Sequence, residues 1–245
     1  MTGFRDRIMV GVLSIVAACG AGAGEPVQIA LSGFHVAADK TVPGEGWWGI
    51  YPDGEGFTLQ PTTVTVKAVR NPADEDDTSL SALSIEDTQE ANPVLLVRGL
   101  PGAQAGPLKT VSPKPTPTFL SPGQDARFTI LSPGRPRWMQ VIATGCAEKE
   151  PGKSYARISN YQLHLVQNID AGVISQALIS LPELGSPDGP QLLWAGDLDR
   201  DGRLDLVYDL SPIYVTTELA LFLSSAAKEG ELVGLVARWT AQGNC

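Results

Sequence analysis

Four aspartates gathered around one glycine form the segment of this chain best suited to chemistry. It reads Asp197-Leu198-Asp199-Arg200-Asp201-Gly202-Arg203-Leu204-Asp205. Carboxylates held this close repel one another, and a hard cation placed among them removes that repulsion. Calcium takes about six to eight oxygen ligands at roughly 2.3–2.6 Å in a flexible geometry. The spacing of the aspartates therefore predicts a Ca2+ site.

The expected ligands are side-chain carboxylates on alternating residues and one backbone carbonyl. They are Asp197, Asp199, Asp201, Arg203 through its carbonyl oxygen, and Asp205. Gly202 permits the sharp turn that such a loop needs, because glycine accepts positive φ without a Cβ clash. The alternative interpretation is an acidic surface turn that holds no metal. If a cation is bound, its expected role is structural, because Ca2+ is a poor Lewis acid and no titratable partner lies nearby in sequence.

The loop differs from an EF-hand in the position that closes the ligand shell. An EF-hand has a bidentate Glu at its twelfth position, where this chain has Tyr208. The shorter pattern across Gly196–Val207 resembles the calcium loops of FG-GAP and VCBS repeats, which lie between strands in β-propellers and related β proteins. The resemblance implies a cation held between two strands. Because the loop occurs once in the sequence, a propeller with repeated calcium sites is not predicted.

The N-terminus has the pattern of a targeting segment. Arg5 and Arg7 precede an apolar run over residues 8–16, which is too short to span a bilayer. The following Val16-Ala17-Ala18-Cys19 resembles a bacterial lipobox, which implies a signal peptide over residues 1–18, lipid on Cys19 and a flexible tether over residues 19–26. Gly20 implies outer-membrane sorting if the host is Gram-negative. Ordinary secretion with cleavage after Ala23 is the alternative.

The cysteines agree with an extracytoplasmic location. Cys19 is lipidated or removed under either cleavage, which leaves Cys146 and Cys245. An oxidising compartment would let these two pair, and closing so long a loop contributes about 4–5 kcal/mol in the chain-entropy model. Two separate thiols are the alternative.

The charge of the chain argues against nucleic-acid binding. The formal net charge is −9, and removal of residues 1–18 takes away two arginines and one aspartate, which makes it −10. Such a chain repels polyanions and anionic lipid headgroups. Membrane association is therefore expected to come from the lipid on Cys19 and not from a basic surface.

Composition and patterning predict a mostly β protein of antiparallel, sandwich-like units with little helix. The 26 Gly and 19 Pro favour turns over long helices. Short runs bounded by Gly, Pro or Asn predict strands. They lie at residues 27–31, 46–51, 57–60, 62–70, 94–97, 126–131, 138–144, 161–166, 173–181, 191–195, 206–210, 218–223 and 232–239. Six prolines make residues 101–122 a predicted linker or long surface loop between an N-terminal β domain (27–100) and a C-terminal β domain (123–245).

Evidence for a catalytic site is weaker than the evidence for the metal loop. The sequence has no zinc-protease, nucleophile-elbow or phosphate-loop pattern. His164 is expected on an exposed strand face. Carboxylates at Glu45, Asp53 and Glu55 near Trp47 and Trp48 could form a glycan-hydrolase cleft, although tryptophans packed on a core are the preferred interpretation.

These observations lead to one expectation about function and one alternative. From Leu193 to Cys245 the chain also resembles a group of bacterial envelope proteins, and that resemblance implies an extracytoplasmic β protein without naming an activity. The expectation is a non-enzymatic, lipid-anchored envelope protein whose calcium loop rigidifies a domain that binds protein or glycan. The alternative is an envelope hydrolase that acts on glycans through carboxylates near Trp47 and Trp48.

Overall fold

Antiparallel strands make up nearly all of the regular structure, as the composition predicts. The computed structural model describes residues 25–71, 80–89, 91–112, 119–132, 135–149, 156–169, 172–184, 189–211 and 216–242. Within these residues the strands form three sheets, and the helical structure is one short 3-10 turn, η1 (Ser224–Ala226). The expectation of a mostly β protein with little helix is confirmed.

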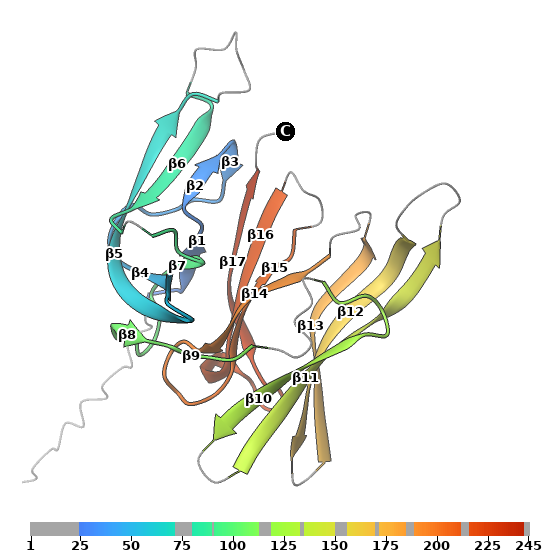
Figure 1. Ribbon diagram of the computed structural model, residues 1–245. Helices are drawn as coiled ribbons and strands as arrows, with labels where there is room; N and C mark the ends of the chain where they lie inside the picture. The colour runs from blue at the N-terminus through green and yellow to red at the C-terminus, as the bar shows by residue number, and fades with distance from the viewer. Residues whose placement is uncertain are drawn as a thin grey trace, which may run out of the picture.

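Sheet A is built from the N-terminal part of the chain (Figure 1). Its strand order is β1-β7-β4-β5-β6-β2, with β8 beside β5. The long β5 bends strongly, so that the sheet curves. The strands are β1 (Gln28–Ala30), β2 (Gly33–His35), β4 (Gly44–Asp53), β5 (Gly56–Val69), β6 (Ala82–Asp87), β7 (Leu95–Arg98) and β8 (Gly106–Pro107).

Sheet B contains the predicted calcium loop and draws its strands from both ends of the chain. Its order is β3-β17-β16-β15-β14-β9. The strands are β3 (Ala37–Ala38), β9 (Lys109–Thr110), β14 (Gln191–Asp197), β15 (Asp205–Asp209), β16 (Thr216–Leu223) and β17 (Gly234–Gln242). The four strands from β14 to β17 are consecutive in sequence and in space, which is the simplest antiparallel arrangement.

Sheet C is a four-stranded meander of long strands. Its strands are β10 (Asp125–Ser132), β11 (Arg135–Lys149), β12 (Ala156–Ile169) and β13 (Gly172–Leu184). Along β12, buried residues alternate with more exposed ones from Tyr161 to Gln167. This period of two is expected for a strand that has one face on a core and the other toward solvent.

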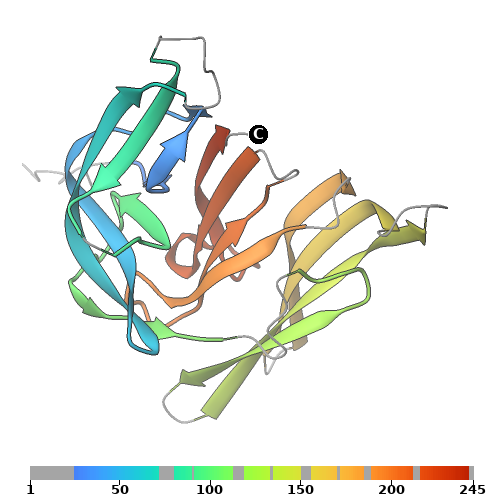
Figure 2. The ribbon, with the colours of Figure 1, turned by 45° about the horizontal axis from the view of Figure 1, so that its top comes forward.

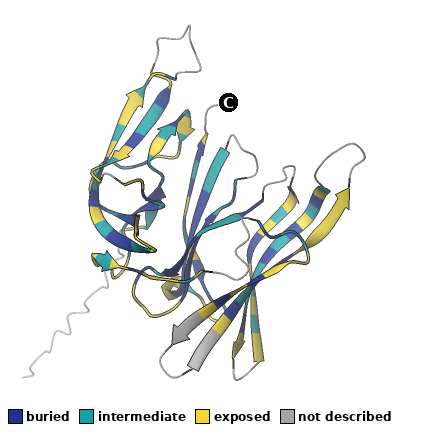
Figure 3. Cartoon of the chain, in the orientation of Figure 1, coloured by how far each residue is buried: buried dark blue, intermediate teal, exposed yellow. Residues whose placement is uncertain are grey.

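Sheet B lies between the other two sheets and is buried on both faces. One core fills the space between sheets A and B and includes Trp47, Val207 and Trp239. A second core fills the space between sheets B and C and includes Leu206 and Phe128. The adjacent Leu206 and Val207 thus enter different cores, because successive side chains of a strand point to opposite faces. Figure 3 shows buried residues concentrated along the strands of sheet B.

The two sequence-predicted β units share a core, and a short strand of the N-terminal unit joins a sheet of the C-terminal unit. β3, from the N-terminal part, pairs with β17 through Ala38 and Ala241. Within the predicted linker, β8 joins sheet A and β9 joins sheet B, while residues 113–118 of that linker lie outside the described residues. The predicted signal peptide, Cys19 and most of the tether also lie outside the described residues.

Cys146 lies exposed on β11, within sheet C. Its predicted partner, Cys245, lies outside the described residues. The last described residue, Gln242, ends β17 in sheet B. The Cys146–Cys245 disulfide therefore stays a prediction.

Candidate metal centre

The acidic loop connects two adjacent central strands and is anchored in both cores. Its ends are paired, with Gly196 opposite Asp205 in the β14–β15 ladder. Leu198 is fully buried in the core between sheets A and B, and Leu204 is buried in the core between sheets B and C. The turn between them uses left-handed backbone at Arg200 (φ 64°) and Gly202 (φ 82°). The expected role of Gly202 in a sharp turn is confirmed.

Three of the four predicted carboxylates come together. One oxygen from each of Asp197, Asp199 and Asp205 lies within 4.8 Å of the other two. Asp205 has no exposed surface, and Asp199 is 7% exposed. Such a group of oxygens, removed from water, is the donor set that a hard divalent cation takes.

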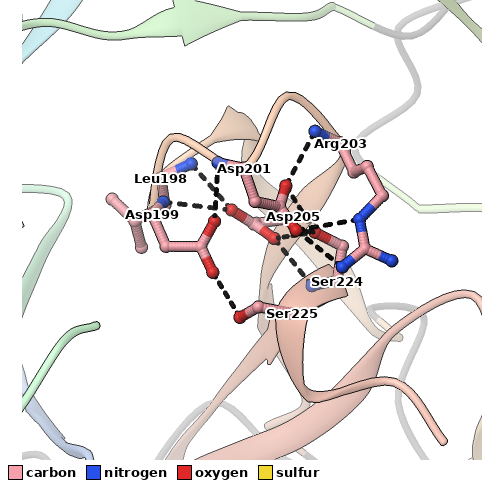
Figure 4. Close-up of polar contacts among 7 residues, drawn as sticks. All are labelled: Leu198, Asp199, Asp201, Arg203, Asp205, Ser224 and Ser225. Atoms are coloured by element: carbon pink, nitrogen blue, oxygen red, sulfur yellow. Dashed lines mark hydrogen bonds and ion pairs between the residues drawn. The ribbon is translucent and has the colours of Figure 1, made fainter. Parts of the chain in front are cut away.

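Asp205 is the most constrained member of the group (Figure 4). Its Oδ2 accepts hydrogen bonds from the backbone N–H of Leu198 at 2.7 Å and of Asp199 at 3.4 Å. Its Oδ1 accepts from both the N–H of Ser224 at 2.8 Å and the hydroxyl of Ser224 at 3.0 Å. Donors on both oxygens fix the orientation of this carboxylate before any ligand arrives.

The pKa of the Asp205 carboxyl is raised to about 7, chiefly by burial and in smaller part by the negative charge of Asp199. The N–H groups of Ser224 and Leu198, and the hydroxyl of Ser224, act in the opposite direction. Burial therefore outweighs hydrogen bonding at this carboxyl. A nearby positive charge would favour the ionised form, since an opposite charge within a few ångströms stabilises a carboxylate.

Asp197 contributes a buried oxygen that has no partner. Its Oδ1 is inaccessible to solvent and accepts no hydrogen bond among the described residues, although the residue as a whole is half-buried. An unpaired buried acceptor is costly, and in native proteins it usually has a protein, water or ion partner. An orphaned oxygen on a residue that is grouped with Asp199 and Asp205 fits a cation ligand.

Asp201 differs from the sequence-based expectation. Its carboxylate forms an ion pair with Arg203, with Oδ2 at 2.7 Å from Nη2, and its two oxygens lie 2.9 and 3.0 Å from the Ser224 hydroxyl, which shares one proton between Asp201 and Asp205. The arginine, two residues on, thus neutralises the one aspartate that lies outside the group of three. The ion pair fixes the position of the Arg203 side chain. The expected role of the Arg203 carbonyl oxygen as a cation ligand stays a prediction.

Two serines complete the surroundings, and sequence reasoning did not assign them to the site. Ser224 bonds to Asp201 and Asp205, while the Ser225 hydroxyl donates to Asp199 Oδ2. Both belong to η1, which follows β16 directly. The available signal was the pair of hydroxyl residues immediately after the apolar run over residues 219–223. Since β16 neighbours β15, the end of that run had to lie beside the beginning of β15.

The other sequence candidates lie apart from this group. Trp47 is 1% exposed in the core and donates its Nε1–H to the Val42 carbonyl at 2.9 Å, which confirms its packing role. Asp53 and Glu55 are exposed at the β4–β5 turn, whereas Trp48 lies further along the ladder opposite Pro61. The geometry thus removes Trp47 as a sugar-stacking surface.

Neither histidine joins the candidate site. His164 is half-buried on β12, where its Nε2 lies 3.0 Å from Oε1 of Gln162. His35 is buried against Trp239, with ring centroids 5.0 Å apart, and its Nε2 lies 3.1 Å from the Leu31 carbonyl oxygen. Both histidines are thus accounted for by local contacts.

Comparison with protein-family models, curated proteins and solved structures gives no match to this chain. The resemblance of the acidic loop to FG-GAP and VCBS repeats accordingly stays a prediction. Among the described residues, no helix is both long and apolar enough to cross a membrane.

Proposed function

We propose that this protein is a non-enzymatic bacterial envelope lipoprotein whose β14–β15 loop holds a structural Ca2+ ion. The observation that supports the cation most directly is the grouping of Asp197, Asp199 and Asp205, with one oxygen of each within 4.8 Å of the others. A second observation in favour of a bound cation is the buried Oδ1 of Asp197, which has no hydrogen-bond partner among the described residues. Asp197, Asp199 and Asp205 would hold the ion, with the flanking hydroxyls of Ser224 and Ser225 close by.

The donor set favours calcium over transition metals. Oxygen ligands suit calcium, magnesium and manganese, whereas zinc and copper sites in proteins usually include histidine or cysteine. The three grouped ligands are all carboxylates. Magnesium usually keeps several waters and binds few protein groups, while calcium accepts a larger set of protein oxygens. A carboxylate-rich, largely buried loop is therefore the better match to calcium.

The position of the loop supports a structural role. Leu198 and Leu204 fix it to both cores, and Asp205 is bonded to η1 across sheet B. An ion at this point would join β14, β15 and the end of β16, where like charges would otherwise push the loop apart. The domain then presents a rigid surface for binding an envelope protein or a glycan. The lipobox-like Cys19 supports attachment to a membrane through lipid.

Calcium titration tests the cation site. The wild-type protein, stripped with a chelator, should bind Ca2+ in isothermal calorimetry, and Asp199→Ala should weaken that binding strongly. At a free concentration of about one hundred times Kd, binding stabilises the native state by about 2.7 kcal/mol. For a domain of this size the melting temperature should rise by roughly 5–10 °C.

Asp53→Ala is the matched control, because Asp53 is an exposed aspartate in the β4–β5 turn, away from the grouped carboxylates. It should keep both the calcium affinity and the shift in melting temperature. A chelated wild-type protein that neither binds nor melts differently with millimolar Ca2+ would overturn the proposal. Magnesium in place of calcium, tested at the same concentrations, should give a smaller shift.

A further inference from the structure

We infer that cation binding in the β14–β15 loop controls the local opening of residues 102–111, here named the crossover segment. This inference rests on the proposed calcium site and adds a conformational consequence to it. The crossover segment takes the chain from sheet A to sheet B, and Figures 1 and 2 show it in green between the two sheets. Its two short strands are β8 and β9.

The crossover segment has few hydrogen bonds of its own. β8 pairs with β5 through two residue pairs, Leu59–Gly106 and Thr58–Pro107, and β9 pairs with β14 through Asp197–Lys109 and Gly196–Thr110. Two further backbone bonds flank these pairs: the N–H of Leu108 donates to the Phe57 carbonyl and that of Val111 to the Ala195 carbonyl, each at 2.9 Å. Such short ladders are among the least stable parts of a fold.

Burial of apolar side chains adds little to the stability of the crossover segment. Leu108 is buried and Ala103 half-buried in the core between sheets A and B, and Val111 is half-buried against the core between sheets B and C. Pro107, Lys109 and Thr110 are exposed. The stability of the crossover segment must therefore depend on whatever else contacts it.

The acidic loop supplies that further contact. Arg200 donates from Nη2 to the Gln104 carbonyl at 3.0 Å, across 96 residues of sequence. The Asp199 carbonyl lies so close to Gly102 that a Cβ on that glycine would come within 2.6 Å of it. A third contact comes from Asp197, which is at once the backbone partner of Lys109 and a member of the carboxylate group.

Asp197 and Asp199 thus serve both the site and the crossover segment. When the cation is absent, repulsion among the carboxylates favours a more open loop. Opening of the loop moves the Asp199 carbonyl away from Gly102. It also breaks the β-pairing between Asp197 of β14 and Lys109 of β9. A bound cation holds these residues in place, so that the segment opens only when the ion also leaves.

Hydrogen exchange measured by mass spectrometry tests this coupling. The reporters are peptides that contain the amides of Leu108 and Val111, and peptides from residues 161–167 of sheet C serve as an internal reference. If opening releases the ion, a free Ca2+ concentration of ten times Kd should slow exchange at the reporters by about tenfold. Exchange in the sheet C peptides should change much less.

Two glycines with nearly the same φ provide a matched pair of variants. Gly102 (φ 64°) lies against the Asp199 carbonyl, whereas Gly54 (φ 59°) has no atom within 4 Å of a built Cβ. Alanine strains both positions alike because of their left-handed backbone. Only Gly102→Ala should lower the calcium affinity, and it should do so through the added contact with Asp199.

A third variant keeps the test decisive if Gly102→Ala does not fold. Arg200→Ala removes an exposed side chain, and with it the bond to Gln104, while leaving every carboxylate in place. It should still bind Ca2+ but should lose much of the tenfold slowing at the reporters. Calcium binding without any slowing at Leu108 and Val111 in the wild type would overturn the coupling and leave the calcium site standing. An absence of calcium binding would overturn both.

Discussion

Ser224 donates two hydrogen bonds to one oxygen of Asp205, from its backbone N–H at 2.8 Å and from its hydroxyl at 3.0 Å. The residues are 19 positions apart, and the contact joins the start of β15 to η1 at the end of β16. The same hydroxyl lies 2.9 Å from Asp201 Oδ2. One small side chain thus connects two carboxylates of the acidic loop.

Replacement of Ser224 by alanine should therefore destabilise the protein. The variant keeps the N–H donor but loses the hydroxyl, and hydrogen bonds to charged groups contribute about 1.5–3 kcal/mol. The free energy of unfolding, measured with urea in the presence of a chelator, should fall by about that amount. Ser180→Ala, at an exposed position of β13, should leave it nearly unchanged. Equal stability of the two variants would contradict the role assigned to this hydroxyl.

Gly49 of β4 should not tolerate a side chain. A Cβ there would lie 2.3 Å from ring atoms of Tyr51, whose hydroxyl donates to Asp87 Oδ1 at 2.7 Å. Gly49→Ala must displace the ring and should cost about 1–3 kcal/mol, as overpacking does. Gly56→Ala is the control, because its Cβ would meet only the Asp53 carbonyl at 3.7 Å. Thermal melts of the two variants provide the comparison.

His35 should make the fold sensitive to mild acid. Burial lowers the pKa of its imidazole below the ordinary value of 6.5, although the bond to the Leu31 carbonyl opposes this shift. The folded state then binds the proton less readily than the unfolded state, so stability falls as pH drops from 6.5 towards the lowered pKa. His35→Gln should gain stability relative to the wild type between pH 7.5 and 5.5, and this difference removes the opposite contribution of Asp205, whose raised pKa is common to both proteins. His164→Gln should lose as much stability as the wild type over the same range, and equal curves for all three proteins would exclude His35 as the cause.

Cys19 should carry the membrane attachment. In a bacterial host, Cys19→Ser should abolish labelling by fatty acid and move the protein from the membrane fraction to the soluble one. Mass spectrometry of the mature N-terminus separates the two cleavage hypotheses. A lipidated Cys19 supports the lipobox, whereas an unmodified N-terminus at Gly24 would support ordinary secretion after Ala23.

Local patterns predicted the strands around the acidic loop well, because turn residues and β-forming runs act over short distances. Residues 191–195 and 206–210, expected as strands, correspond closely to β14 and β15. The pairing of β3 with β17 could not be predicted, because Ala37 and Ala38 carry no strand signal and their partner lies near the other end of the chain. β8 and β9 were missed for a related reason, since two-residue strands in a proline-rich segment show no period of two.

The sequence predicted the residue types of the candidate metal site but not which side chains lie together. Alternation selected Asp197, Asp199 and Asp205, which the fold brings together, and it also selected Asp201, which pairs with Arg203. That choice depends on where the Arg203 side chain points, and sequence spacing does not determine it. The roles of Ser224 and Ser225 depend on the pairing of β15 with β16, which brings the far end of one strand to the near end of the other.

The central position of sheet B also sets the order in which the protein can fold. The inner face of sheet A packs on strands whose residues come from 191–242. In the same way, Ala38 of β3 can pair only once Ala241 of β17 has been synthesised. The first hundred residues to be synthesised therefore lack the strands of sheet B against which their part of this core packs. Folding must await the C-terminal strands, and contacts of such long sequence separation make it slow. Until then the nascent chain remains unfolded, which would suit the export across a membrane that the proposed lipoprotein requires.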